Sequence, residues 1–142
     1  ALSPFMQHVP NVDTIIIETE RIAAEPIYED VRRFAEGRIV LLKPKEREYH
    51  LYAAGSPAII IKDHITEAPI VTINDITTPS IEKILVDATI APELEFARGA
   101  EIYYIYENAS EMFKINKKTM LRYATRRGKK EEIEKLINST MP

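Results

Sequence analysis

The residues best suited to chemistry in this chain form one dense basic block. Residues 114–130 contain eight lysines or arginines and no aspartate or glutamate. A block of this kind attracts phosphate backbones and acidic protein surfaces, and a tyrosine within it could stack on a base. The candidate partner- or nucleic-acid-binding residues are Lys117, Lys118, Arg122, Tyr123, Arg126 and Arg127.

Three interpretations of this block stay open at the level of sequence. Its bases could pair with the chain's own excess acids, contact an acidic partner protein, or contact a nucleic acid. Leu121, Tyr123 and Ala124 interrupt the charges, which favours packing one side of the segment inward. The acidic remainder of the chain would repel a duplex unless the basic face is well isolated, so a protein partner is favoured over DNA.

Metal-dependent cleavage of phosphodiesters is the alternative chemistry. It needs carboxylates that hold a divalent cation and a lysine that helps to activate water. Glu18, Asp63 and Asp75 are the candidates, because they lie near the ends of predicted strands. The adjacent Glu82 and Lys83 do not fit a nuclease motif, because neighbours on a helix point about 100° apart. For that pair we expect a solvated helix face.

Other catalytic and cofactor sites find no support. The three histidines, His8, His50 and His64, lack metal-ligand spacing, and cysteine is absent. The four glycines are too far apart for a phosphate-cradling loop, and no serine stands in a G-x-S-x-G elbow. The sequence therefore predicts no catalytic residues, no metal and no cofactor.

Length and charge set the broad class. The chain has 142 residues and a net charge of −3, which divides into −9 for residues 1–113, +8 for 114–130 and −2 for 131–142. The length suits one domain with a real core, and no apolar stretch is long enough to cross a membrane. The missing signal-peptide pattern favours the cytoplasm. Because the chain starts at Ala1, we expect it to be part of a longer protein.

The first half of the chain predicts a strand, a helix and a second strand. Residues 12–20 and 38–43 are β-branched or apolar, and 27–36 has helical spacing with Gly37 placed to end it. This order predicts two parallel strands joined by a right-handed crossover. Further strands are expected at 48–53, 58–62 and 69–73, the first two as a hairpin.

The second half predicts helices at residues 80–89, 98–112, 116–127 and 129–138. Ser80 and Asn116 are expected N-caps, and Gly128 is expected to separate the last two helices. Asp87, if it faces inward, needs a partner, and the basic block offers arginines. We expect one mixed α/β domain over 1–142, with a βαβ start, a small mixed sheet in 12–76 and a helical C-terminal subdomain in 79–138.

Two segments resemble AbiEi-type antitoxins, the regulators of bacterial type IV abortive-infection systems. Pro79 to Asp87 reads P-S-I-E-K-I-L-V-D and is similar to their P-[ST]-[LI]-E-K-x-L-V-D stretch. Asn116 to Arg127 is similar to their N-x-x-x-[LM]-x-R-Y-A-x-R-R stretch. The matching positions are Glu82, Lys83, Asp87, Arg122, Tyr123, Arg126 and Arg127.

This resemblance implies a regulatory domain without catalytic residues. Such antitoxins join an N-terminal winged helix, which binds promoter DNA, to a C-terminal α/β domain that counters a nucleotidyltransferase toxin. The chain resembles the C-terminal part, and no winged helix precedes its first strand. The resemblance therefore implies a transcriptional regulator whose partner is a nucleotidyltransferase-type toxin, with promoter recognition left to a missing winged helix.

Overall fold

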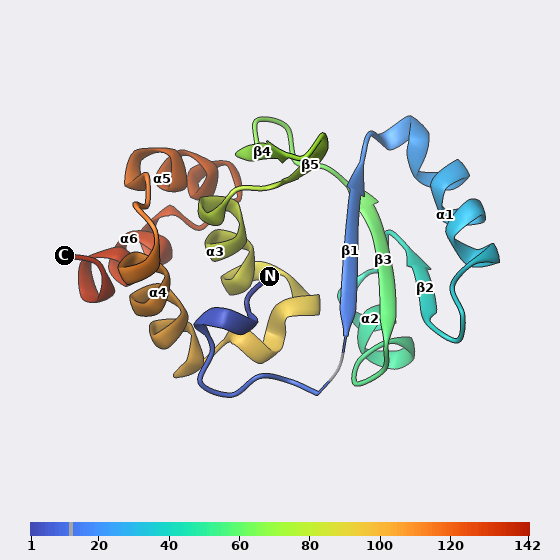
Figure 1. Ribbon diagram of the computed structural model, residues 1–142, viewed down its shortest axis with the longest axis horizontal. Helices are drawn as coiled ribbons and strands as arrows, with labels where there is room; N and C mark the ends of the chain where they lie inside the picture. Colours follow the sequence, from blue (N-terminus) through green and yellow to red (C-terminus); the bar gives the residue numbers. More distant parts are fainter. Residues whose placement is uncertain (12) are drawn as a thin grey trace. The chain divides into compact units, whose positions relative to one another are not determined.

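The computed structural model describes residues 1–11 and 13–142, which form two compact units (Figure 1). One unit comprises residues 10–66, and the other combines 1–9 with 67–142. Residue 12, the expected start of the first strand, lies outside the described residues. The sheet-forming and helical parts were expected to meet between residues 76 and 79, whereas the two units meet between residues 66 and 67, and the first nine residues join the helical unit.

The unit of residues 10–66 is built on a three-stranded parallel sheet. Its strands are β1 (Thr14–Thr19), β2 (Ile39–Leu42) and β3 (Ala58–Asp63), and β3 lies between the other two (Figure 1). The helix α1 (Ala24–Arg33) connects β1 to β2, so the predicted pair of parallel strands joined by a helix is confirmed. The two strands are not neighbours, because β3 inserts between them.

The predicted hairpin of residues 48–53 and 58–62 is wrong, although the strand expected at 58–62 is confirmed as β3. Residues Glu46–Tyr52 form the helix α2, which connects β2 to the parallel strand β3. Tyr49 and Ala53, four residues apart, face inward and pack with Ala58 and Ile60 of the sheet. This spacing is typical of a helix and not of a strand. Two parallel strands cannot be joined by a tight turn, so the chain between β2 and β3 has to form a crossover connection, and α2 lies in it.

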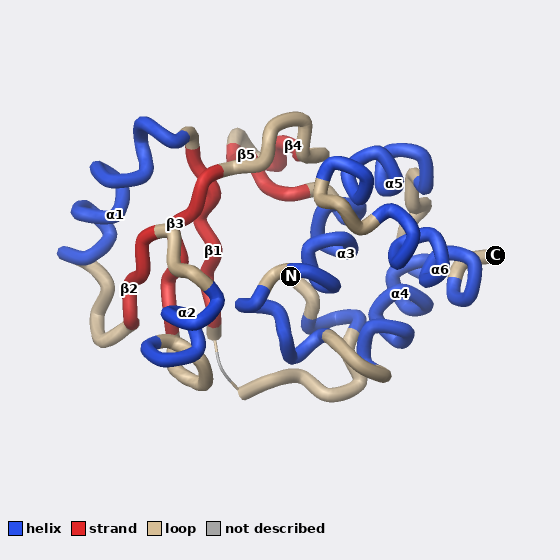
Figure 2. The backbone as a smooth tube through the Cα atoms, turned by 180° about the vertical axis from the view of Figure 1, so that it is seen from behind, coloured by secondary structure: helices blue, strands red, loops and turns tan. Residues whose placement is uncertain are grey.

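The second unit holds a hairpin and four helices. Strand β4 (Ile70–Ile73) confirms the strand predicted at 69–73, and it pairs antiparallel with β5 (Ile76–Pro79), which the sequence did not predict. The mixed α/β class is confirmed, with the parallel and antiparallel strands in separate sheets. The helices, seen from behind in Figure 2, are α3 (Ile81–Ile90), α4 (Glu101–Met112), α5 (Lys117–Arg126) and α6 (Lys130–Thr140). The described residues also contain three short 3-10 helices, at Ser3–Phe5, Arg21–Ala23 and Pro92–Ala97.

Local capping chemistry marks the start of α3 and both ends of α5. Ser80 Oγ accepts a hydrogen bond from the Lys83 amide, and Asn116 Oδ1 accepts one from Thr119, so both expected N-caps are confirmed. Gly128 ends α5 with φ of +69°. Its amide and the next one donate to carbonyls of the last helical turn, the pattern of a Schellman motif. None of the helices among the described residues is long and apolar enough to cross a membrane.

The buried sheet core of residues 10–66 yields a stability prediction. Ile60 is fully buried at the centre of β3, and its replacement by alanine leaves a cavity. We expect Ile60→Ala to lower the free energy of unfolding by about 3 kcal/mol, measured by urea denaturation. The matched control is Ile22→Ala, at an isoleucine that is 86% exposed, which should change it by less than about 0.5 kcal/mol. Equal losses would contradict the assigned core.

Candidate functional site

Asp87 of α3 is the centre of a buried polar cluster that joins α3 to α5. Asp87 Oδ2 accepts a hydrogen bond from Lys83 Nζ at 2.5 Å. Asp87 Oδ1 accepts one from the Tyr123 hydroxyl at 2.8 Å and one from Arg127 Nη1 at 2.6 Å. Lys83 is only 3% exposed, and Asp87 and Tyr123 are buried as well. We call these four side chains the Asp87 cluster; in it the buried carboxylate is compensated by two cations and a phenol donor.

Tyr123 lies close to both cations of the Asp87 cluster. Lys83 Nζ and the Arg127 guanidinium carbon each lie 5.8 Å from the centre of its ring, within the range of cation–π attraction. The hydroxyl also accepts a hydrogen bond from Arg127 Nη1 at 2.9 Å. Burial, with the nearby Asp87 carboxylate, raises the pKa of Tyr123 to about 12, so the phenol stays protonated and donates to Asp87.

Glu82 makes a second connection between the same two helices. Its Oε1 accepts a hydrogen bond from the Asn116 amide at 2.9 Å, at the start of α5. Burial acts to raise the pKa of the Glu82 carboxyl, but hydrogen bonds from the Asn116 amide and the Ser80 side chain outweigh it and hold the pKa below its usual 4.5. Glu82 therefore stays ionised and fixes the N-terminus of α5.

The expectation that Glu82 and Lys83 form a solvated helix face is wrong. Both side chains are buried; Glu82 accepts a hydrogen bond from the amide of Asn116, the N-cap of α5, and Lys83 Nζ lies 5.8 Å from the ring centre of Tyr123 on α5. The physical reason is that the positions bearing charge on α3 lie against another charged helix, so burial is accompanied by pairing. The sequence analysis missed the pair of Lys83 and Asp87, for which the spacing of four residues on a helix was the available signal.

The Asp87 cluster separates the basic block into an inner and an outer side. Arg127 and Tyr123 point inward, which confirms the expectation that an inward Asp87 pairs with an arginine of the block. Lys117 Nζ donates to the backbone carbonyls of Met141 and Pro142, and so holds the C-terminus. Three of the six candidate binding residues therefore serve the fold.

The other three candidates, Lys118, Arg122 and Arg126, are exposed on α5 and form what we call the outer stripe. Arg126 makes a solvent-exposed ion pair with Glu67 at 3.2 Å. Within residues 1–11 and 13–142, neither Lys118 nor Arg122 forms an ion pair. Successive members are four residues apart, so they follow one another along the same side of the helix at about 6 Å intervals.

Of the three carboxylates proposed for the nuclease alternative, two lie on neighbouring strands and the third lies in the other unit. Glu18 and Asp63 lie near the ends of the neighbouring strands β1 and β3, and Asp63 Oδ1 is 2.8 Å from Lys43 Nζ. Asp75 lies in the turn between β4 and β5, in the other unit. The described part of the chain contains no group of three or more histidine or carboxylate side chains placed to hold a metal ion.

The two segments that carry the resemblance in sequence meet in the Asp87 cluster, and one family covers them both. The model of a protein family described as "Family of unknown function (DUF6577)" matches residues 1–142. The chain belongs to this family. No curated protein matches the chain, and no solved structure does.

The Asp87 cluster predicts a large loss of stability when its carboxylate is removed. Asp87→Asn removes the carboxylate that pairs with the buried Lys83 and the part-buried Arg127, and we expect it to lower the free energy of unfolding by about 3 kcal/mol. The control is Glu29→Gln, which breaks the exposed ion pair of Glu29 with Arg32 and should cost less than about 1 kcal/mol. Chemical denaturation measures both, and similar losses would contradict the proposed role of the cluster.

Glu82 predicts a pH dependence of stability. Because its pKa is lower in the folded chain than in the unfolded chain, its contribution is complete above about pH 4.5 and is lost as the pH falls through the folded-state pKa. We expect Glu82→Gln to be less stable than the parent chain at pH 7 and to lose stability less steeply on acidification. Thermal unfolding between pH 3 and pH 7 tests this; parallel profiles would contradict it.

Proposed function

We propose that this chain is a non-enzymatic, partner-binding domain of an antitoxin-like transcriptional regulator, and that the outer stripe of α5 binds an acidic surface of the partner protein. The observation that carries the proposal is the division of the basic block: Arg127 and Tyr123 are held inside, whereas Lys118 and Arg122 are exposed without an ion pair in the described residues. The resemblance to AbiEi-type antitoxins names the expected partner as a nucleotidyltransferase-type toxin.

The rigid attachment of α5 supports binding at this stripe. Asp87 contacts α5 near its C-terminal end, through Tyr123 and Arg127, and Glu82 contacts the amide of Asn116 at its start. These contacts fix the rotation of the helix, so the exposed cations are presented in one arrangement before a partner arrives. Preorganisation of this kind lowers the entropic cost of binding.

Charge balance favours a protein partner over a duplex. The unit that carries α5 contains 12 Asp or Glu and 11 Lys or Arg residues, so its summed charge does not attract a polyanion from a distance. Attraction is confined to the outer stripe. A local acidic patch on a protein matches three cations along one helix, whereas a DNA duplex would also meet the surrounding carboxylates.

Charge reversal at two exposed positions tests the proposal. We expect Lys118→Glu combined with Arg122→Glu to weaken binding of the nucleotidyltransferase-type toxin that the resemblance implies by at least about tenfold, because attraction becomes repulsion. Surface plasmon resonance measures the affinity, and a mobility-shift assay with the DNA upstream of the gene runs in parallel. The melting temperature should stay unchanged, since both side chains are exposed.

The matched control is Arg32→Glu combined with Arg33→Glu, which makes the same change of charge on exposed positions of α1. It should leave toxin binding intact. Loss of binding in both double variants would show that the effect comes from net charge, and it would contradict the proposal that the outer stripe is a specific binding surface. Binding that survives reversal of the outer stripe, or DNA binding that alone is lost, would contradict a protein partner at this site.

The absence of catalysis is also testable. We expect no cleavage of plasmid DNA or RNA with Mg²⁺ or Mn²⁺, assayed by gel electrophoresis. Asp63→Asn is the control variant, since it removes the carboxylate that lies beside Lys43. Metal-dependent cleavage that disappears in Asp63→Asn would contradict a non-enzymatic domain and favour the nuclease alternative.

A further inference from the structure

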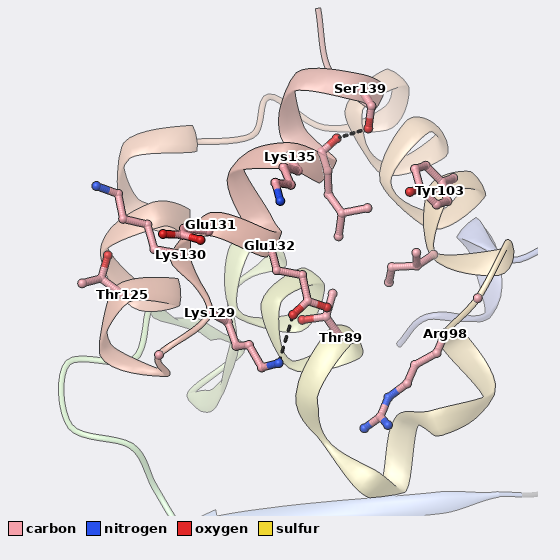
Figure 3. A pocket seen from close by; sticks show the side chains of 14 residues that line it. Thr89, Arg98, Tyr103, Thr125, Lys129, Lys130, Glu131, Glu132, Lys135 and Ser139 are labelled. Carbon is pink, nitrogen blue, oxygen red and sulfur yellow. Dashed lines mark hydrogen bonds and ion pairs between the residues drawn. The ribbon is translucent and has the colours of Figure 1, made fainter.

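A cleft in the helical unit gathers cations that the outer stripe does not include. Its volume is about 1160 Å³, and it lies between the end of α3, the start of α4 and the helix α6 (Figure 3). Arg98 and Tyr103 stand on one side of it, and Lys129, Glu132 and Lys135 on the other. Lys118, Arg122 and Arg126 do not line it, so the cleft is distinct from the proposed partner surface.

The charge of the cleft favours an anion. Four lining residues are basic and two are acidic, and the ion pair between Lys129 and Glu132, at 3.0 Å, is solvent-exposed and therefore easily exchanged. Arg98 Nη2 donates to the Ile90 carbonyl, while its Nε is buried and has no hydrogen-bond partner in the described residues. The Arg98 guanidinium lines the cleft, and phosphate oxygens match guanidinium geometry.

The hydroxyl groups of the cleft favour a ligand that also carries donors. Thr89 and Ser139 donate their protons to the carbonyls of Val86 and Leu136, so their oxygens keep lone pairs for a ligand. Sugar hydroxyls and amino groups of a base are donors of the required kind. Tyr103, which is 49% exposed, adds an aromatic face to the same cleft.

We propose that this cleft binds a nucleoside phosphate. Its phosphate lies between Arg98 and the lysines Lys129 and Lys135, its sugar donates to the lining hydroxyls, and its base stacks on Tyr103. The same unit would then carry two separate sites: the outer stripe for a macromolecular partner and the cleft for a small phosphorylated ligand.

Titration of the full chain with AMP, adenosine and inorganic phosphate tests the proposal. We follow amide shifts of the labelled protein by NMR and expect AMP to bind more tightly than either of its parts. Tyr103→Leu should weaken AMP binding about tenfold, because base stacking is lost. Lys135→Gln should weaken it about fivefold, because a charged hydrogen bond to phosphate is lost. Both side chains are exposed, so folding should be preserved.

Two control variants make the outcome decisive. Tyr104→Leu changes the next residue of α4, a tyrosine that is 41% exposed and lies outside the cleft, and Lys118→Gln removes a cation of the outer stripe. Neither should change the affinity for AMP. The proposal is overturned if AMP does not saturate the protein, if phosphate alone binds as tightly, or if Tyr104→Leu weakens binding as much as Tyr103→Leu. We expect the AMP-site variants to keep their binding of the toxin, because the changed side chains lie outside the outer stripe, so this test stands apart from that of the partner surface.

Discussion

The carboxylate of Asp87 sets the arrangement of the helical unit. It is buried on α3 and is compensated by a lysine of its own helix and by an arginine and a phenol from α5. A buried ion is tolerated only where its partners are fixed, so these contacts bind α5 in one rotation about its axis. Everything that α5 presents to solvent depends on that rotation.

As a consequence, some residues of the basic block stabilise the fold, whereas others are exposed to solvent. Tyr123 and Arg127 are used by the fold, and Lys117 holds the C-terminal carbonyls. Lys118 and Arg122 stay exposed without an ion pair in the described residues, and Arg126 makes a weak surface pair with Glu67. The charge of +8 on the block is therefore not all available to a partner, because Lys117 and Arg127 stabilise the domain itself.

Local chemistry in the sequence was sufficient wherever a short segment acts alone. The N-caps at Ser80 and Asn116, the left-handed Gly128 and the strand β3 followed from residue type and spacing. The segment 48–53 was misassigned as a strand, because a short run of mixed residues has no unambiguous period and its connection to a parallel strand is a tertiary fact. Arg98, Tyr103 and Lys135, separated by up to 37 residues, carried no signal that they line one cleft.

The sequence by itself determined the mixed α/β class, the bounds of α1 and of the helices α3 to α6 to within a few residues, and the single segment in which positive charge is concentrated. It also indicated that an inward Asp87 could pair with an arginine of that segment, as Arg127 does. Tertiary structure alone decided that Glu82 and Lys83 are buried, and which of the cations face solvent. The reason is physical: periodicity identifies the sides of a helix, but whether a charged side is buried depends on the side chains that the opposing helix brings to meet it.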